Sequence, residues 1–155
     1  MPRPDPRTRR SLEVRRSGIH GKGVYATGPI PAGTRLIEYR GEHISHAEGD
    51  RRYPVEEGVP HHTFLFVLDE DTVIDGARGG NLSRWINHSC DPNCESVWED
   101  GHVYVDAVRD LAPGEELTMD YHLVAEEPHT AALAREYPCR CGAPACRGTL
   151  LGENR

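Results

Sequence analysis

The sequence predicts a mostly β fold with short helices, built as a single domain. The chain has 155 residues, which is the size of one ordinary domain of roughly 100–200 residues. Its apolar residues form many short runs, and none of these runs is long enough to span a bilayer. The 16 glycines and 12 prolines separate these runs and supply the turns that short strands need.

Four short strands are expected in the first part of the chain. The alternation of apolar and charged residues in Leu12–Arg16 is typical of an edge strand. Turns rich in glycine or proline follow the first two strands, and the two prolines in residues 28–33 exclude a helix there. The expected strands are Leu12–Arg16, Val24–Ala26, Thr34–Tyr39 and Gly41–Ile44, the last as the partner of the third.

A polar helix and a hairpin are expected next. Ser45–Glu57 is polar, Ser45 is a candidate N-cap, and Pro54 interrupts the helix. Thr63–Asp69 has the strongest strand pattern in the chain, because it combines aromatic and aliphatic residues in one short run. Thr72–Asp75 is predicted to return as the second strand of the hairpin.

The second half of the chain continues with a hairpin, a strand and short helices. Glu95–Trp98 and His102–Val108 flank Glu99-Asp100-Gly101, which is typical of a hairpin turn. The turn at Pro113-Gly114 precedes an alternating strand at Glu115–Tyr121. Short helices are expected at Gly80–Ile86 and Thr130–Glu136, and a cysteine-rich loop at Pro138–Gly148.

Charge is unevenly distributed along the chain. Residues 1–16 carry six arginines and two acidic residues, a net charge of +4, and residues 1–10 are also Pro-rich, so we expect a basic, disordered arm there. The remaining residues have a net charge of −11. This acidic body disfavours direct nucleic-acid binding and fits a cationic partner such as a basic peptide, although a role in solubility explains the same charge.

The N-terminal charges are not followed by an apolar stretch, so the sequence shows no secretory signal peptide and no membrane segment. We therefore expect an intracellular protein, cytoplasmic in a bacterium and nuclear otherwise. The cysteine count agrees with an intracellular location. Five cysteines are an odd number, and without a signal peptide they disfavour a disulfide framework.

Three of the cysteines lie close together near the C-terminus. Cys139-x-Cys141-x4-Cys146 places three thiolates within eight residues, so one loop can surround a tetrahedral metal ion. A fourth ligand must come from Cys90 or Cys94. This compact set of thiolates favours one structural zinc over iron, and free buried thiols are the alternative. Zinc would supply folding energy to the loop and fasten it to the segment that carries the fourth cysteine.

Three further segments hold residue types that binding and catalysis use. Asn87 and His88 can hydrogen-bond a ligand, and the glycines of residues 18–23 let the backbone approach one closely. The glycine spacing is not the dinucleotide fingerprint GxGxxG, and no helix pattern follows it. Tyr121 ends an alternating strand, where its hydroxyl can orient a nucleophile. Each segment taken alone also fits an ordinary turn or a packed tyrosine.

Four motifs occur in a fixed order: GKG at residues 21–23, RWINHSCDPN at 84–93, GEELTMDY at 114–121 and CRCGAPACRG at 139–148. Together they resemble the SET-domain protein lysine methyltransferases with their post-SET zinc loop. The resemblance covers roughly residues 11–150. It implies a SET domain at 11–122, a post-SET segment at 123–155 with the zinc loop at 139–148, and a fold of small sheets with a C-terminal pseudoknot.

The resemblance also implies a reaction and a set of site residues. S-adenosylmethionine would bind on one face as methyl donor, and a lysine of a basic protein or peptide such as a histone would enter a channel from the opposite face. Tyr121 matches the catalytic tyrosine. The zinc ligands would be Cys90, Cys139, Cys141 and Cys146, which leaves Cys94 as an ordinary thiol. The residues assigned to the donor or its surroundings are His20, Lys22, Gly23, Tyr53, Phe64, Arg84, Asn87 and His88.

Met119 departs from the family pattern, in which phenylalanine or tyrosine stands two residues before the catalytic tyrosine. Methionine is flexible and has no hydroxyl to hold a water molecule, so we expect a roomier channel that permits di- or trimethylation. Lys22 is the only lysine and belongs to the predicted donor site, so the substrate lysine must lie on another molecule. The alternatives are a catalytically silent SET-like module that binds a basic peptide, and a zinc-stapled interaction domain.

Overall fold

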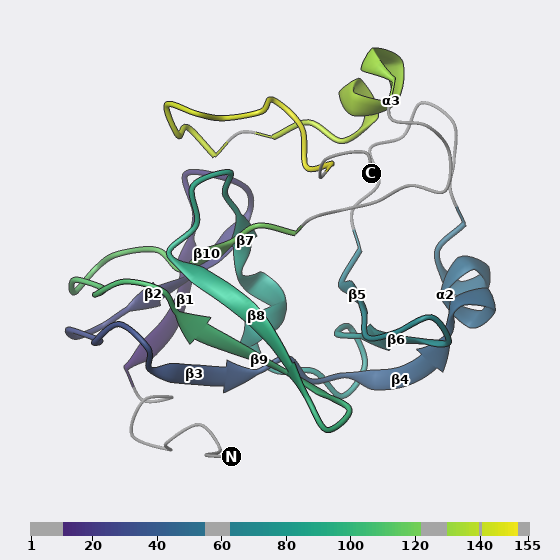
Figure 1. Cartoon of the computed structure of the whole chain (residues 1–155), viewed down its shortest axis with the longest axis horizontal. Helices are drawn as coiled ribbons and strands as arrows, with labels where there is room; N and C mark the ends of the chain where they lie inside the picture. Colours follow the sequence, from purple (N-terminus) through teal and green to yellow (C-terminus); the bar gives the residue numbers. More distant parts are fainter. Residues whose placement is uncertain (1–10, 55–62, 122–129, 140, 152–155) are drawn as a thin grey trace.

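The computed structural model describes residues 11–54, 63–121, 130–139 and 141–151, which form three small β-sheets and short helices (Figure 1). The predicted mostly β fold is confirmed. The expected basic arm at residues 1–10 lies outside the described residues. None of the helices in the described part of the chain combines the length and the apolar character that a membrane crossing requires.

The first sheet consists of two strands that match the sequence prediction. β1 (Leu12–Arg16) and β2 (Lys22–Ala26) are antiparallel, and β2 begins two residues earlier than expected. Gly21 in the turn between them has a φ of 47°, a left-handed conformation that favours glycine. An isolated β-bridge between Tyr25 and Glu116 joins this sheet to the segment that leads into Thr118–Met119, a strand of the central sheet.

The central sheet has five strands in the order β3-β9-β8-β10-β7. β8 and β9 form the predicted hairpin, and Asp100 and Gly101 in its turn have φ values of 50° and 78°. β10 runs parallel to both of its neighbours, β7 and β8. The strands are β3 (Arg35–Glu38), β7 (Asn87–His88), β8 (Cys94–Glu99), β9 (His102–Ala107) and β10 (Thr118–Met119).

The third sheet contains the predicted hairpin of β5 (Leu65–Val67) and β6 (Thr72–Asp75), with β4 (Glu42–Ser45) on the other side of β6. Helix α2 (His46–Arg52) follows β4 directly. The hydroxyl of Ser45 accepts a hydrogen bond from the N–H of Glu48 at 3.0 Å, so the predicted N-cap is confirmed.

The partner expected for Gly41–Ile44 was wrong. We expected this segment to pair with Thr34–Tyr39, but β4 pairs with β6, and β3 pairs with β9. Gly41 permits the observed pairing, because a Cβ atom there would lie 2.3 Å from the carbonyl oxygen of Asp75 at the end of β6.

Several elements are shorter than their sequence patterns suggested. The expected strand at Thr63–Asp69 is a strand only at β5, and the one expected at Glu115–Tyr121 only at β10. The helix expected within Gly80–Ile86 is the 3-10 helix η1 (Leu82–Trp85). The helix expected at Thr130–Glu136 is confirmed as α3 (Ala131–Glu136), with Thr130 as its N-cap.

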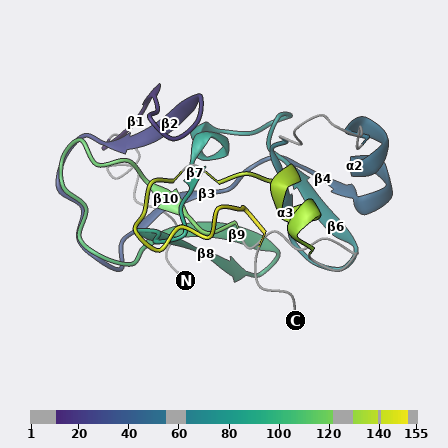
Figure 2. The ribbon, with the colours of Figure 1, turned by 90° about the horizontal axis from the view of Figure 1, so that it is seen from above.

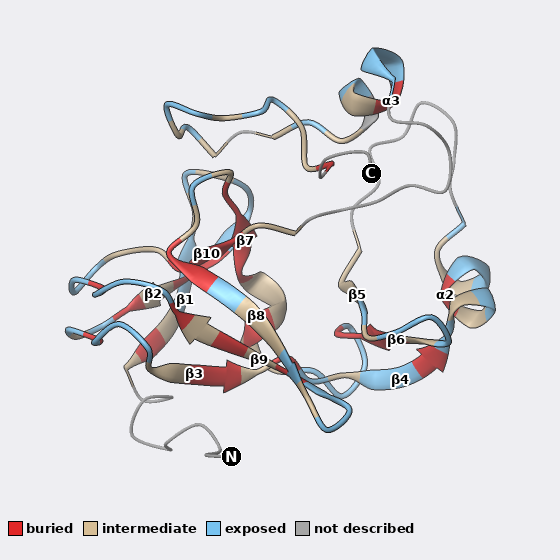
Figure 3. Cartoon of the chain, in the orientation of Figure 1, coloured by how far each residue is buried: buried red, intermediate tan, exposed pale blue. Residues whose placement is uncertain are grey.

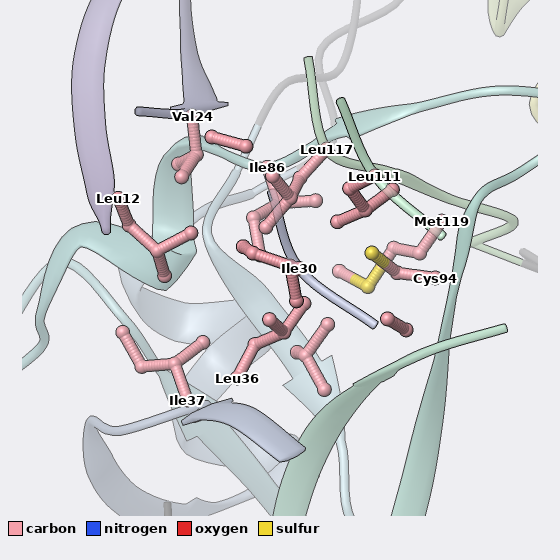
Figure 4. Packing of buried hydrophobic residues seen from close by; sticks show 13 residues of the cluster. Leu12, Val24, Ile30, Leu36, Ile37, Ile86, Cys94, Leu111, Leu117 and Met119 are labelled. Atoms are coloured by element: carbon pink, nitrogen blue, oxygen red, sulfur yellow. The ribbon is translucent and has the colours of Figure 1, made fainter. Parts of the chain in front are cut away.

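The main hydrophobic core lies between the first sheet and the central sheet (Figures 3 and 4). Aliphatic side chains from both sheets and from the loops between them fill it, and Cys94 and Met119 contribute its sulfur atoms. Burial of these side chains removes apolar surface from water and holds the sheets together. Its buried members are Leu12, Val24, Ala26, Ile30, Leu36, Ile37, Ile86, Cys94, Val105, Ala107, Leu111, Leu117 and Met119.

Asn93 connects the segment after β7 to the segment that contains β10. Its side-chain nitrogen donates to the carbonyl oxygen of Glu116 at 2.8 Å, and its side-chain oxygen accepts from the N–H of Thr118 at 2.8 Å. Asn93 and Thr118 are both buried, so these bonds are shielded from water. Two segments about 25 residues apart in sequence are thereby held side by side, which is the pairing that the expected pseudoknot requires.

We predict that Asn93→Ala destabilises the fold by about 2–3 kcal/mol, because it leaves buried main-chain groups without partners. Urea unfolding followed by circular dichroism measures the change. Asp91→Ala is the matched control, since Asp91 is exposed and only its backbone N–H is hydrogen-bonded to Ser89. Equal stability of the two variants would contradict the role assigned to Asn93.

Candidate active site and cysteine cluster

Most of the predicted site residues gather where β7, β10 and the C-terminal loop meet. Figures 1 and 2 both show the C-terminal segment (yellow) running beside this end of the central sheet. β7 supplies Asn87 and His88, and Tyr121 follows two residues after the end of β10. The parallel register places Thr118 opposite Asn87 and Met119 opposite His88.

Asn87 organises the turn that leads into β2. Its side-chain nitrogen donates to the carbonyl oxygens of His20 at 3.1 Å and Lys22 at 2.9 Å. The same nitrogen donates to the carboxylate of Glu116 at 2.9 Å. These bonds bring together three predicted site residues, His20, Lys22 and Asn87. The side-chain nitrogen of Asn87 makes its hydrogen bonds within the protein.

Glu116 is a site residue that sequence reasoning missed. Its carboxylate accepts hydrogen bonds from the hydroxyls of Ser17 at 2.6 Å and Tyr25 at 3.3 Å, in addition to the one from Asn87. A Cβ atom at Gly23 would lie 2.1 Å from Oε1 of Glu116, so any larger residue there would displace the Glu116 carboxylate. Nothing in the sequence pattern distinguishes Glu116 from Glu115 beside it.

A group of cations and aromatic rings lies around Trp85. The Nζ of Lys22 is 4.9 Å from the centre of the Trp85 ring, and the Cζ of Arg84 is 5.0 Å from it. Phe64 stacks edge-on against Trp85 with ring centres 5.0 Å apart. The Nε of Arg84 is buried, and among the described residues it is the one buried side-chain nitrogen or oxygen without a hydrogen-bond partner. An N–H group without a partner can donate a hydrogen bond to an acceptor atom of a ligand.

Tyr53 makes its contacts elsewhere. Its hydroxyl donates to the fully buried carboxylate of Asp75 at 3.0 Å, and Arg52 pairs with the same carboxylate at 3.1 Å. Burial and the nearby carboxylate raise the pKa of Tyr53. These bonds anchor the end of α2 to β6, and a contact between Tyr53 and a donor stays a prediction.

Tyr121 is held by both its backbone and its side chain. Its hydroxyl donates to the carbonyl oxygen of Ile86 at 2.6 Å, and its N–H donates to Nδ1 of His88 at 3.0 Å. The rings of His88 and Tyr121 meet edge-on, with centres 5.2 Å apart. Burial raises the pKa of the Tyr121 hydroxyl, so it stays protonated at neutral pH and its oxygen can accept a further hydrogen bond.

Met119, the predicted product-specificity position, is buried in the main core. Its side chain is 3% exposed and lies close to that of Cys94 (Figure 4), which it faces in the β10–β8 register. Tyr121 packs against the same core cluster. Met119 therefore fills part of the core against which Tyr121 packs.

The four cysteines that the family resemblance selects come together. The sulfur atoms of Cys90, Cys139, Cys141 and Cys146 all lie within 4.8 Å of one another. Tetrahedral zinc with Zn–S bonds of about 2.3 Å places its sulfur ligands about 3.8 Å apart, and the sulfurs of Cys90 and Cys139 are 3.8 Å apart. The donor set therefore fits zinc. Cys94 lies in the core and donates to Asn93 instead.

The thiol chemistry of the cluster also fits a cation. Burial raises the pKa of Cys90 and Cys139. Burial acts in the same direction on Cys141, but hydrogen bonds from backbone N–H groups and neighbouring thiols outweigh it and lower its pKa to about 6. Four thiolates cannot share so small a space without a positive charge, because their mutual repulsion keeps protons on some of them.

Comparison with known proteins agrees with the fold and identifies the family. A family model for the SET domain matches residues 21–122, and the chain belongs to the SET domain family. The histone-lysine N-methyltransferase TRX1 of Oryza sativa is 40% identical over 148 residues, 92% of this chain and 14% of that protein. The H3 lysine-4 specific enzyme of Saccharomyces cerevisiae is 41% identical over 141 residues, 87% of this chain and 13% of that protein.

A human relative, histone-lysine N-methyltransferase 2B, is 37% identical over 147 residues, which is 92% of this chain and 5% of that protein. The chain thus spans only 5–14% of the length of these three relatives. The family model and these relatives confirm the predicted resemblance to the SET-domain family.

We predict that the purified protein binds one zinc ion per chain and that Cys90→Ser loses it, because a structural zinc site needs four ligands. Elemental analysis after gel filtration gives the zinc content. Cys94→Ala is the matched control and should retain the metal, since its sulfur lies in the core. If Cys94→Ala lost the metal and Cys90→Ser retained it, Cys90 would be excluded as the fourth zinc ligand.

Proposed function

We propose that the protein transfers a methyl group from S-adenosylmethionine to a lysine side chain of a histone or another basic protein. The observation that carries the proposal is the convergence of Tyr121, the Asn87-bound turn and the Trp85 group at one end of the β7–β10 pair. The relatives named as histone-lysine N-methyltransferases support the same reaction. A histone substrate would place the protein in the nucleus, and a bacterial basic protein would place it in the cytoplasm.

The basic and aromatic residues around Trp85 are suited to the donor. S-adenosylmethionine carries a carboxylate, and the unpartnered Nε of Arg84 together with the ammonium of Lys22 offers it positive charge. The turn held by Asn87 carries His20, Lys22 and Gly23, and we assign main-chain groups of His20 and Gly23 to the donor. We assign Asn87 and His88 to the donor through their main chain, and Phe64 through its ring.

The donor supplies an electrophilic methyl group on a sulfonium. The neutral lysine amine attacks this methyl group in line, so the N–C bond forms as the S–C bond breaks, and the extra amine proton leaves to water. A free lysine has a pKa near ~10.4 and is mostly protonated at neutral pH. Desolvation in an apolar channel and the nearby sulfonium charge both favour loss of that proton.

Tyr121 positions the amine in this scheme. Its hydroxyl is protonated at neutral pH, so it is not a general base, and its oxygen can accept a hydrogen bond from the amine. Alignment of amine, methyl and sulfur then contributes much of the rate. The body beyond residue 16, with its net charge of −11, would attract a basic substrate, and we place this acidity at the channel mouth.

We propose, further, that the cysteine cluster holds one structural zinc. The Cys139–Cys146 loop would then be fastened to Cys90, two residues after His88, and so to the site. Zinc in this position would contribute folding energy and take no part in the chemical step.

We predict that Tyr121→Phe lowers methyl transfer by at least roughly a hundredfold, because the amine loses its orienting oxygen. Transfer of labelled methyl from S-adenosylmethionine to a panel of basic proteins including histones provides the assay. Tyr104→Phe is the control, since Tyr104 lies on the hairpin strand β9, where its ring packs against Arg35.

Three results of this assay separate the candidate functions. Transfer that depends on Tyr121 supports the enzyme. Donor binding by calorimetry without transfer to any protein shows that the panel lacks the substrate. Absence of both donor binding and transfer would reject the enzyme and leave a silent module that binds a basic peptide.

We predict that the product is di- or trimethyl-lysine, because Met119 leaves more room beside Tyr121 than an aromatic residue and holds no water. Mass spectrometry of the substrate peptide identifies the product. Met119→Tyr should shift it toward monomethyl-lysine, while the volume-conserving control Met119→Leu should not. Monomethyl-lysine as the sole wild-type product would disprove the hypothesis.

A further inference from the structure

An ion pair joins the cysteine loop to the residue beside Tyr121. Asp120 lies between Met119 and Tyr121, and both of its carboxylate oxygens accept from the guanidinium of Arg147, at 2.7 and 3.0 Å. Arg147 follows Cys146 directly, and its backbone N–H donates to the sulfur of Cys90 at 3.3 Å. One arginine therefore contacts the cysteine cluster through its backbone and the end of β10 through its side chain.

Burial distinguishes this pair from the exposed pair of Arg51 with Glu48, which is also two-pronged. The side chains of Asp120 and Arg147 are 11% and 30% exposed, whereas Arg51 in its pair with Glu48 is 75% exposed. Exposed pairs contribute little, but a two-pronged arginine–carboxylate pair fixes both distance and orientation. The Arg147–Asp120 pair can thus specify where the cysteine loop sits relative to Tyr121.

His88 makes a second connection between the same two places. Its Nδ1 accepts the N–H of Tyr121 at 3.0 Å, so in the neutral ring the proton is on Nε2. Nε2 lies 3.4 Å from the sulfur of Cys90 and can donate to it. The Nδ1 of His88 is also 3.6 Å from Asp120, which is too long for a hydrogen bond, so the N–H of Tyr121 decides the tautomer.

These contacts act at the end of a very short strand, since β10 has only two residues. The hydroxyl of Tyr121 reaches the carbonyl oxygen of Ile86 only while the backbone at Tyr121 keeps its place. A small shift there would move the phenol oxygen, on which alignment of a reacting amine depends.

We propose that Arg147 and Asp120 are positioning residues that set Tyr121 relative to the cysteine cluster, with His88 as the second connection. The kinetic part of this proposal rests on the proposed methyl transfer, and the structural part does not. A purely structural role for the pair would appear as loss of metal or of global stability, with Tyr121 unaffected in the folded, metal-loaded protein.

The test uses the full chain loaded with zinc and compares Arg147→Ala, Arg147→Lys and Asp120→Asn with wild type. Amide hydrogen exchange by NMR reports on the N–H of Tyr121, which is bonded to His88, and on the N–H of Leu117, which is bonded to Val24. Zinc content and the steady-state constants kcat and KM for the donor are measured on the same samples. Arg135→Ala is the control, because Arg135 is exposed on α3.

We expect one zinc per chain in every variant and unchanged exchange at Leu117. At Tyr121, exchange should become roughly tenfold faster in Arg147→Ala and Asp120→Asn, because the strand end opens more often. In the same variants kcat should fall by roughly tenfold to a hundredfold while KM changes by less than about threefold. Arg147→Lys should lie in between, since lysine keeps the charge but not the two-pronged geometry.

Two results would overturn the proposal. The first is unchanged Tyr121 exchange in Arg147→Ala and Asp120→Asn. The second is loss of zinc in these variants, which would make the pair a support of the metal site. If wild type transfers no methyl group at all, the proposed function fails, and Tyr121 exchange in the zinc-loaded protein still decides whether Arg147 and Asp120 position this residue.

Discussion

The parallel pairing of β7 with β10 is the constraint on which the rest of the site depends. Each of these strands has only two residues, so their few main-chain hydrogen bonds cannot hold the two segments together alone. Asn93 adds buried bonds to the Glu116–Thr118 stretch at one end, and Asn87 bonds to Glu116 and the turn of residues 20–22 at the other. Three distant stretches of sequence converge because the amide side chains of Asn87 and Asn93 hydrogen-bond groups of the other two stretches.

The molecule is acidic as a whole but basic around Trp85, and the two regions suit different ligands. The body is acidic, which favours the approach of a basic partner. The group around Trp85 is locally basic, because Lys22 and Arg84 both lie within about 5 Å of its ring, and it can accept an anionic part of a ligand. Tyr121 is neutral at neutral pH, and burial raises its pKa further, so its charge does not affect a cationic substrate. Attraction of the substrate and binding of the donor thus depend on different residues.

Much of the site could be predicted from sequence because its residues lie in contiguous motifs. The choice of Cys90 over Cys94 came only from the family resemblance, and the structure places Cys94 in the core. The partner of Gly41–Ile44 could not be predicted, because strand alternation says nothing about which distant strand is adjacent. Glu116 was missed for a related reason, since its importance lies in accepting from three residues remote in sequence.

The C-terminal segment shows why the cysteine cluster and an ion pair belong together here. Of its described residues, 130–139 and 141–151, only Leu133 and Leu151 are buried apolar side chains, so packing alone gives this segment little stability. Metal ligation would compensate, because ligand binding that occurs only in the folded state adds directly to folding free energy. Zinc ligation would fix the sulfur atoms, however, and would leave the loop free to rotate about Cys90. Arg147 adds the second attachment point, and two separated attachments define an orientation where one cannot. Since the second attachment is the residue next to Tyr121, the fold orients the loop and the tyrosine by the same contact.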